Sequence, residues 1–510
     1  AAPALDLQSL LQSGREHLYK WRIDEAAGIA DQALEIAADP QDKGLAYYLK
    51  SEVEFHKGNY RKAGDYVRKA NELLPNYKEI GDFLSYVSKL AETGEKFKEV
   101  KAEHFKIKYF HPSDAVLVGY AEDTLKRAYF EIGSDLEFYP DDPITVEIYP
   151  DPESFALAST LSKEDIKTTG VVGICKFNRL MIISPRLLPK GYAWLDTLSH
   201  EYTHYLLFLK SENTVPVWLH EGIAKFEEKR WKNKGINILN PLYETLLARA
   251  LKENNLVSMD EMYPSFGKLS SAYRAQLAFA QVGTIVDFLV RKWGNNSLNR
   301  LLESLRQKDD YETAVKRVTN ISFSEFYDSW IADLRSRNLV EKIPGIEVKE
   351  LEFQKSGSES KDQSVDLKEL DNSKARNYTR LGDMLKVRGR LRAAAYEYEK
   401  ALNLDPISPI ILNRIAGVET ALGEYEKAEE KLSPLVEIHP EYVDTYINLG
   451  RIYLQRKNYT KAQEAYETAI SINPFNPEIH VALISIYEKL GMADLVKSEK
   501  IVLSILLKEE

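Results

Sequence analysis

Five consecutive residues near the middle of the chain, His200-Glu201-Tyr202-Thr203-His204, have the types and spacing that metal-dependent hydrolysis requires. On a helix, His200 and His204 project from the same face, so both imidazoles can reach one zinc ion. Glu201 lies beside them and can accept a proton from water that the metal polarises. The alternative is a pair of histidines satisfied by hydrogen bonds within a core helix. Because both histidines and the glutamate stand in the required order, we favour the metal site.

A catalytic zinc ion needs a third protein ligand and a coordination position left for water. The tight His-x-x-Gly-x-x-His extension that would supply this ligand is absent. Farther along, Pro216-Val217-Trp218-Leu219-His220-Glu221-Gly222-Ile223-Ala224 predicts a second helix, and Gly222 and Ala224 are small enough for it to approach the first closely. Glu221 and His220 are rival third ligands. Neighbours on a helix point about 100° apart, so only one of the two can face the metal.

Together, His-Glu-x-x-His and the later Trp-Leu-x-Glu-Gly-x-Ala at residues 218–224 resemble the gluzincin metallopeptidases, in particular the peptidase-MA-like group. The resemblance extends over about Glu103–Arg335. It implies that Glu221 rather than His220 is the third zinc ligand and that Glu201 is the general base. It also implies a thermolysin-like catalytic domain, in which a small mixed sheet lies over a helical lower half.

The chain departs from this family at the residue that would stabilise the oxyanion of the tetrahedral intermediate. Gluzincins often place a Tyr or His on a later helix for this purpose, and the family often shows a Tyr-Ala-Gln run there. This chain has Phe279-Ala280-Gln281 instead, without the hydroxyl. Tyr273 on the same stretch is the substitute that we name, although in a chain with 30 tyrosines a packing role is the stronger interpretation.

The C-terminal quarter of the chain repeats every 34 residues. Small residues recur where paired helices would cross, large ones fill the seam, and Pro ends the second helix of each pair. The aligned positions are Gly382, Ala394, Tyr398, Ala401 and Pro406, then Ala416, Ala428, Leu432, Leu435 and Pro440, then Gly450, Ala462, Tyr466, Ala469 and Pro474. A degraded fourth copy begins at Pro477. These segments resemble tetratricopeptide repeats, which implies a concave surface for protein or peptide partners.

A weaker repeat signal and a different central segment precede this array. Gly44–Pro75 fits one repeat, an earlier copy ends at Pro40, and a helix at 77–93 closes the N-terminal stack. In the centre, alternation and helical periodicity predict strands and helices in turn. The expected strands are 105–110, 144–149, 170–175 and 180–184, the expected helices are 113–136 and 151–161, and residues 192–334 read as nearly all helical.

We therefore predict a multidomain, mainly α protein with one α+β catalytic domain and repeat solenoids at both ends. The boundaries are 1–100 for N-terminal repeats, 101–340 for the metallopeptidase-like domain, 341–373 for a polar linker and 374–510 for about four C-terminal repeats. Because Gln354–Ser373 has hardly an apolar residue, we expect a loose tether there. The C-terminal array is then expected to be a separate recognition module that folds alone from about Lys374.

Composition excludes several other classes of protein. Lys plus Arg number 68 and Asp plus Glu 78, a net charge of -10 without any basic block, so nucleic acid is not expected as a partner. No apolar run approaches the ~20 residues of a membrane helix, and no transmembrane segment is expected. The single cysteine, Cys175, excludes Cys-rich zinc sites and is expected to be a buried, inert thiol. The opening Ala1-Ala2-Pro3-Ala4 favours export to a periplasmic or extracellular location after signal-peptide removal over a cytoplasmic one.

Two functions remain after these exclusions. The first, which we favour, is a zinc peptidase. Motifs that select a free amino terminus are absent, which favours an endopeptidase over an exopeptidase. Its partners are protein or peptide substrates and the protein partners of the repeats. The second is an interaction scaffold with an inactive or structural metallopeptidase-like domain, in which uncapped repeats could also bind other copies of the chain. The last helix, apolar around Ile501–Leu507, is expected to cap the array rather than to join copies.

Overall fold

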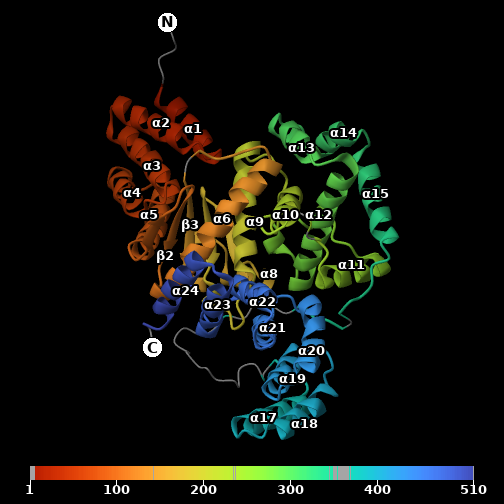
Figure 1. The fold of residues 1–510 in the computed structure, drawn as a ribbon. Helices are drawn as coiled ribbons and strands as arrows, with labels where there is room; N and C mark the ends of the chain where they lie inside the picture. The colour runs from red at the N-terminus through yellow and green to blue at the C-terminus, as the bar shows by residue number, and fades with distance from the viewer. Residues whose placement is uncertain are drawn as a thin grey trace.

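The computed structural model describes residues 6–508 except 142, 234, 236, 344, 349–352, 354–366 and 368. The described chain is mainly helical and contains one small mixed sheet, as the sequence predicts (Figure 1). Helical layers lie at both ends of the chain, and the sheet lies between them beside α6 (Ala115–Asp135). None of the described helices has both the length and the apolar character needed to cross a membrane.

The N-terminal helices pack as antiparallel pairs. They are α1 (Leu7–Tyr19), α2 (Ile23–Ile36), α3 (Pro40–His56), α4 (Tyr60–Leu73) and α5 (Lys78–Gly94). The alanines that set the predicted repeat, Ala26 and Ala63, are fully buried where the helices cross. At Gly14 an added Cβ would lie 2.6 Å from Leu49 Cδ2, so a larger residue would push α1 away from α3. Small residues therefore set the spacing of this stack.

The sheet has the strand order β1-β2-β3-β5-β4. Its strands are β1 (Lys98–Lys101), β2 (Phe105–Tyr109), β3 (Ile144–Tyr149), β4 (Gly173–Lys176) and β5 (Arg179–Ile183). The central pairs β2–β3 and β3–β5 are parallel, whereas β1 and β4 pair antiparallel to their single neighbours. Among the described strands, β4 therefore forms the edge that faces the site discussed below.

A helical half lies against this sheet and forms the largest apolar core with it. Its helices are α9 (Trp194–Ser211), α10 (Val217–Glu227), α11 (Pro241–Glu253), α12 (Ala272–Trp293), α13 (Ser297–Arg306), α14 (Tyr311–Thr319) and α15 (Phe323–Ser336). The short helices α7 (Pro152–Ser159) and α8 (Lys163–Thr169) instead share a second core with α3, α4 and α5. Helix α9 is the most enclosed of them, because Trp194, Leu198 and Tyr202 are fully buried. It packs under β4 and β5, which fixes its side chains relative to the edge strand.

The C-terminal array follows the predicted 34-residue period. It consists of α17 (Ser373–Val387), α18 (Leu391–Leu402), α19 (Pro409–Ala421), α20 (Tyr425–Ile438), α21 (Val443–Gln455), α22 (Tyr459–Ile472), α23 (Pro477–Leu490) and α24 (Ala493–Leu506). An added Cβ at Gly450 would lie 2.6 Å from the ring of Tyr466. Two periods earlier in the chain, an added Cβ at Gly382 would likewise collide with the ring of Tyr398. The recurring Gly thus exists because a buried tyrosine lies against its backbone.

The C-terminal array is docked on the central part of the chain, which corrects the expectation of a separate module. The backbone N–H of Tyr192 donates to Ile472 O at 3.1 Å, and the indole Nε1 of Trp194 donates to Ile470 O at 3.0 Å. At the far end of the array, the hydroxyl of Tyr120 in α6 donates to Glu499 of α24 at 2.8 Å. Figure 1 shows α22–α24 beside α6 and α9, while α17 and α18 extend away from them.

The expected tether at Gln354–Ser373 falls mostly outside the described residues. Its described end is anchored, contrary to the expectation, because Leu367 and Leu370 are buried in the apolar core of the first repeat. Glu369 between them also pairs with Lys190 of the central domain. These few apolar side chains are enough to fix the entrance to the array.

The N-terminal helices are joined to the sheet by buried polar groups. The hydroxyl of Tyr60 donates to Glu147 of β3 at 2.9 Å, and Arg179 of β5 donates to Phe55 O at 2.6 Å. Glu147 and Arg179 are almost fully buried and lie 3.8 Å apart. Because each charge has a partner, the interface avoids the cost of an isolated buried charge.

A first prediction concerns Gly191, which precedes α9 and lies against the backbone of Ile472. Its φ is +73°, and an added Cβ would collide with Ile472 O. Gly191→Ala should therefore loosen the docked array, costing on the order of 1–3 kcal/mol. The matched control is Gly389→Ala, where φ is +72° but nothing lies within 4 Å. Limited proteolysis should cut the Gly191 variant faster between centre and array, and equal cutting of both variants would contradict this interface.

A second prediction concerns His56, packed between Phe55 and Phe177 at the N-terminal interface. Burial and the nearby Arg179 lower its pKa from 6.5 to about 3. Below pH 6.5, His56 is therefore protonated in the unfolded chain but stays neutral in the folded chain. The free energy of unfolding consequently falls as the pH drops from 6.5 towards 3. At pH 5 this protonation costs the parent about 2 kcal/mol of its free energy of unfolding, and His56→Phe should remove that cost. Denaturant unfolding at pH 7.5 and 5 measures it, and an unchanged difference between the two pH values would refute it.

Candidate metal centre

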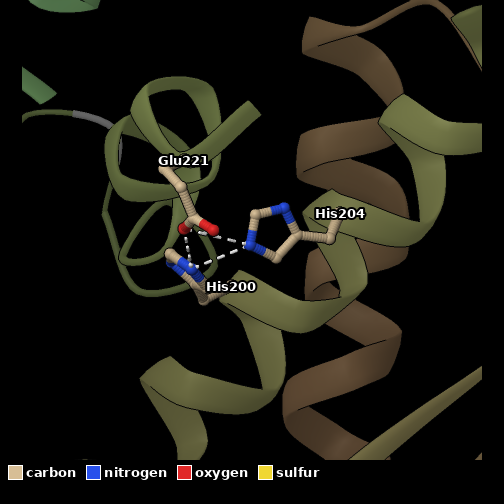
Figure 2. A group of neighbouring side chains, drawn as sticks. All are labelled: His200, His204 and Glu221. Atoms are coloured by element: carbon tan, nitrogen blue, oxygen red, sulfur yellow. Dashed lines mark hydrogen bonds and ion pairs between the residues drawn. The ribbon is translucent and has the colours of Figure 1, made fainter. Parts of the chain in front are cut away.

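Three of the predicted site residues meet between two helices. His200 and His204 lie one turn apart on α9, and Glu221 reaches them from α10 (Figure 2). Oε2 of Glu221 lies 3.4 Å from Nε2 of His200 and 3.4 Å from Nε2 of His204, and the two Nε2 atoms are 3.1 Å apart. The structure thus brings these three side chains to one point, as Figure 2 shows.

The size of this triangle fits a small metal ion. Zinc binds imidazole nitrogen and carboxylate oxygen at about 2.0–2.2 Å in tetrahedral sites, so two of its ligand atoms stand roughly 3.3 Å apart. The three measured separations scatter closely around that value. Two imidazoles and one carboxylate form a ligand set typical of catalytic zinc, with a fourth position left open.

The electrostatics of the triangle also favour a cation. Burial opposes ionisation of Glu221, yet His204 and His200 outweigh it and hold its pKa well below the usual value. Burial lowers the pKa of His200, but hydrogen bonding to Glu221 and then Glu228 overcomes it and raises that pKa to about 9. The half-buried carboxylate of Glu221 is therefore stabilised by positive charge at this point, which either protons or a metal ion can supply.

Glu201 lies on the same helix beside this triangle and is 5% exposed. Burial raises the pKa of Glu201, while the two histidines and the backbone N–H of Cys175 oppose the rise. Strand β4 approaches Glu201 closely at Gly173, where an added Cβ would lie 2.9 Å from Oε1 of Glu201. A carboxyl group with a raised pKa, held by a backbone donor beside three metal-type ligands, is suited to accepting and returning a proton.

His220, the rival third ligand, occupies a different position. Its Nδ1 lies 2.5 Å from Nδ1 of His204, on the side of that ring opposite Nε2. Burial, then the charge of His204, lowers the pKa of His220 to about 3, so His220 is neutral and accepts this hydrogen bond. We infer that His220 orients His204 from behind, which favours Glu221 as the residue facing the metal position.

Glu228 is a site residue that the sequence analysis missed. Its Oε2 lies 3.5 Å from Nδ1 of His200 and 2.8 Å from Nζ of Lys225. The charge of Lys225 and contact with His200 outweigh burial and hold the pKa of Glu228 far below its usual value. The available signal was spacing, because Glu228 follows Glu221 by seven residues, or two helical turns, and so shares its face.

Gly222 of α10 serves a different contact from the expected one. Gly222 was expected to let α10 approach α9, but its added Cβ would lie 2.8 Å from Val282 O and 2.9 Å from Val286 Cγ2. Both belong to α12. Gly222 therefore allows α10 to pack closely against α12. This packing positions α10 so that Glu221 points towards α9.

Tyr273, the expected oxyanion donor, does not lie at the triangle. It is half-buried near the start of α12, where burial and the charge of Glu253 raise its pKa, and it does not line the cavity next to the triangle. Phe279, two turns along, does line that cavity, and its ring centroid lies 6.5 Å from that of His200. The described residues therefore give no support to Tyr273 as the oxyanion donor, because Tyr273 is not among the residues that line the cavity next to the triangle.

A cavity of about 1340 Å³ opens onto the triangle. Its floor is formed by α9 and α10, and one side is formed by Gly173–Cys175 of edge strand β4. Trp21 of the N-terminal helices lines one part, and residues from Glu369 to Tyr442 of the C-terminal array line another. All three parts of the chain therefore surround the same space. Cys175 faces it half-buried, and burial raises the pKa of its thiol well above the usual value.

Comparison with known protein families matches two segments of the chain. The Peptidase MA superfamily matches residues 122–336, which include the whole triangle and Glu201, and the tetratricopeptide repeat family matches residues 408–474. A Peptidase MA superfamily domain and tetratricopeptide repeats are therefore both present. The two histidines and Glu221 lie inside the first segment, and part of the cavity wall lies inside the second.

Two of the curated relatives match stretches of about 100 residues of this chain. The heat-shock protein cognate co-chaperone sgt12 of Aspergillus fumigatus is 33% identical over 109 residues, or 20% of this chain and 32% of its own. The small glutamine-rich tetratricopeptide repeat-containing protein 2 of Mycosarcoma maydis is 27% identical over 99 residues, or 19% of this chain and 28% of its own. The chain thus spans less than a third of either relative. A thermophilic repeat protein of Thermus thermophilus aligns in structure with 26% of this chain and 74% of its own, at 27% identity and a TM-score of 0.25.

A third prediction tests Glu228. Glu228→Gln should lower the affinity for added Zn²⁺ by roughly 10- to 100-fold, because His200 loses the carboxylate that orients its ring and Lys225 loses its partner. Competition with a chromogenic chelator measures this affinity. Glu122→Gln, at an exposed position on α6, is the control and should leave the affinity unchanged. If Glu228→Gln binds Zn²⁺ as tightly as the control variant, Glu228 does not position the ligand.

Proposed function

We propose that this protein is a zinc-dependent peptidase whose tetratricopeptide repeats engage protein substrates or partners. The observation that carries the proposal is the triangle of His200, His204 and Glu221, beside the buried carboxyl of Glu201 on a cavity floor. The match of the surrounding segment to the Peptidase MA superfamily supports the same reaction class. The geometry favours this function over a purely structural metal site, because a structural site needs no proton acceptor and no adjoining cavity.

The metal would be held by His200, His204 and Glu221, and when bound it would supply a Lewis acid that polarises a carbonyl group and acidifies water. Glu201 would act as the general base and then return its proton to the departing amine. Its raised pKa suits both directions of transfer. Cys175 holds the Glu201 carboxyl through its backbone N–H, so Glu201 does not have to be ordered when the substrate arrives.

The edge strand supports a peptide as the substrate. β4 pairs only with β5 in the described sheet, and Gly173–Cys175 line the cavity next to Glu201. An extended peptide can add to such an edge by main-chain hydrogen bonds, which are independent of its sequence. Because the cavity continues past the triangle on both sides, towards Trp21 and towards Tyr442, we propose cleavage within a chain rather than at its end.

A fourth prediction separates hydrolysis from metal binding. Glu201→Gln should keep the fold and one zinc per chain, because the amide preserves shape and the ligands are untouched. Hydrolysis of a peptide library should fall by about 10²- to 10⁴-fold, the usual contribution of a general base. His204→Ala should lose both zinc and activity. Metal analysis measures the zinc content, and mass spectrometry of digests measures hydrolysis. A Glu201→Gln variant that cleaves at the parental rate would contradict the role of Glu201 as general base.

A further inference from the structure

We propose that the C-terminal repeat array forms the second wall of the peptide-binding cleft and that Glu441 on this wall selects substrates with a basic side chain. The inference rests on the proposed function, which it deepens by naming a substrate class. It also gives the repeats a role in catalysis, since they would bind the same peptide segment that is cleaved. Recognition at a remote surface would then not be needed.

The first observation is that the catalytic floor and the repeats bound one continuous space. The cavity that contains His200 and Glu221 is also lined by Asp405, Glu441 and Tyr442. Asp405 comes from the turn before α19, and Glu441 and Tyr442 come from the turn before α21. The turns that join successive repeats therefore line the same cavity as the triangle of His200, His204 and Glu221.

The second observation is that this wall is held in place. Tyr192 and Trp194, at the start of α9, donate hydrogen bonds to Ile472 O and Ile470 O at the end of α22. Nζ of Lys190 lies 4.5 Å from the ring centroid of Tyr442, so a residue of the array wall is itself in contact with the central domain. His200 lies less than two turns beyond Trp194 on the same helix. The distance between the two walls is thus fixed by a short, rigid segment.

The third observation is the charge of the wall. Its described ionisable side chains are three acids, Glu369, Asp405 and Glu441, together with His439, whose pKa burial lowers. No Lys or Arg is found among the described residues of the array that line the cavity. Glu369 is paired with Lys190, whereas no ion pair within 4.0 Å is found for Asp405 or Glu441 among the described residues.

Glu441 is the acid of this wall that interacts with charged groups of the cavity floor. Its nearest charged neighbours are Lys229, Lys225, Asp196 and Glu228, all from the floor that carries the metal triangle. Enclosure in the cavity raises its pKa, and the two lysines reduce this effect only in part. Lys225 is already paired with Glu228. The side chain of Glu441 is exposed, lines the cavity and has no ion-pair partner within 4.0 Å among the described residues, so the cationic group of a substrate Lys or Arg can pair with it.

The shape of the space agrees with this occupant. The side chains of an extended peptide paired with β4 would point alternately to the two faces of the sheet, so every second one would lie on the same face. The acidic wall and β4 line the same cavity, and long Lys or Arg side chains can extend through this space on their apolar stems. The side chain of Tyr442 and that of Ile407 on the same wall offer apolar surface for those stems.

The experiment uses the full chain and peptide sets that differ at a single position, which holds Lys, Ala or Glu. The parent should cleave the Lys peptide with the highest kcat/KM at one subsite. Glu441→Gln should lower kcat/KM for this peptide about tenfold and leave the Ala peptide unchanged. Glu441→Lys should reverse the order in favour of Glu. Glu430→Lys, an equal charge change at an exposed site of α20 away from the cavity, is the control and should keep the parental order.

A binding measurement separates this inference from the proposed reaction. Fluorescence anisotropy of the same peptides with zinc-loaded Glu201→Gln should show the Lys preference, and adding Glu441→Gln should abolish it. Cleavage by the parent with no change of preference in either Glu441 variant would overturn the inference and leave the peptidase standing. Charge-selective binding without any cleavage would uphold the inference and overturn the peptidase. Neither cleavage nor binding of any peptide would overturn both.

Discussion

Helix α9 is the element on which the rest of the structure depends. Its first turn holds the C-terminal array through Trp194, its middle carries His200, Glu201 and His204, and its last turns meet the N-terminal helices. At that end Phe208 stacks on Trp21 with ring centroids 3.6 Å apart. The buried helix α9 therefore fixes the spacing between the triangle of His200, His204 and Glu221 and the helices at both ends of the chain. A shift of α9 along its axis would disturb all three contacts together, which explains why its apolar faces are so fully enclosed.

The second constraint is that a group of buried charges must be balanced before any metal arrives. Around the triangle, each acid has a partner of opposite charge or a backbone donor: Glu221 faces the two histidines, Glu228 faces Lys225, and Glu201 accepts from the N–H of Cys175. This balance keeps the ligands pointing inward at separations that suit an ion. Preorganisation of this kind lowers the reorganisation needed for chemistry, since the dipoles and charges are already aligned.

Local patterns predicted much of this arrangement. The alternating run at 144–149 is found as β3 with those bounds, and the five-residue motif lies on one helix face as its spacing requires. β1 and α8 escaped prediction because they carry little apolar pattern: β1 is the polar run Lys98–Lys101, which becomes a strand only by pairing with β2. Glu228 escaped for a related reason. The seven-residue spacing places Glu228 on the same face of α10 as Glu221, but only the packing of α10 against α9 brings Glu228 to 3.5 Å from Nδ1 of His200.

The docking of the C-terminal array was the largest departure from the sequence analysis, and its cause is general. A repeat period records the contacts that each repeat makes with the next, because those contacts recur. Contacts with another part of the chain occur once and leave no period. Trp194 and Gly191 meet the array mainly at the backbone of Ile470 and Ile472, whose carbonyl groups exist at every position of every sequence. These main-chain contacts leave no mark in the residue types, and the side-chain contacts of the same interface, such as Tyr120 with Glu499, occur once and so leave no period either. The consequence of this interface is physical: two segments that read as independent modules enclose one cavity, so a ligand that enters it meets the repeats and the metal position together.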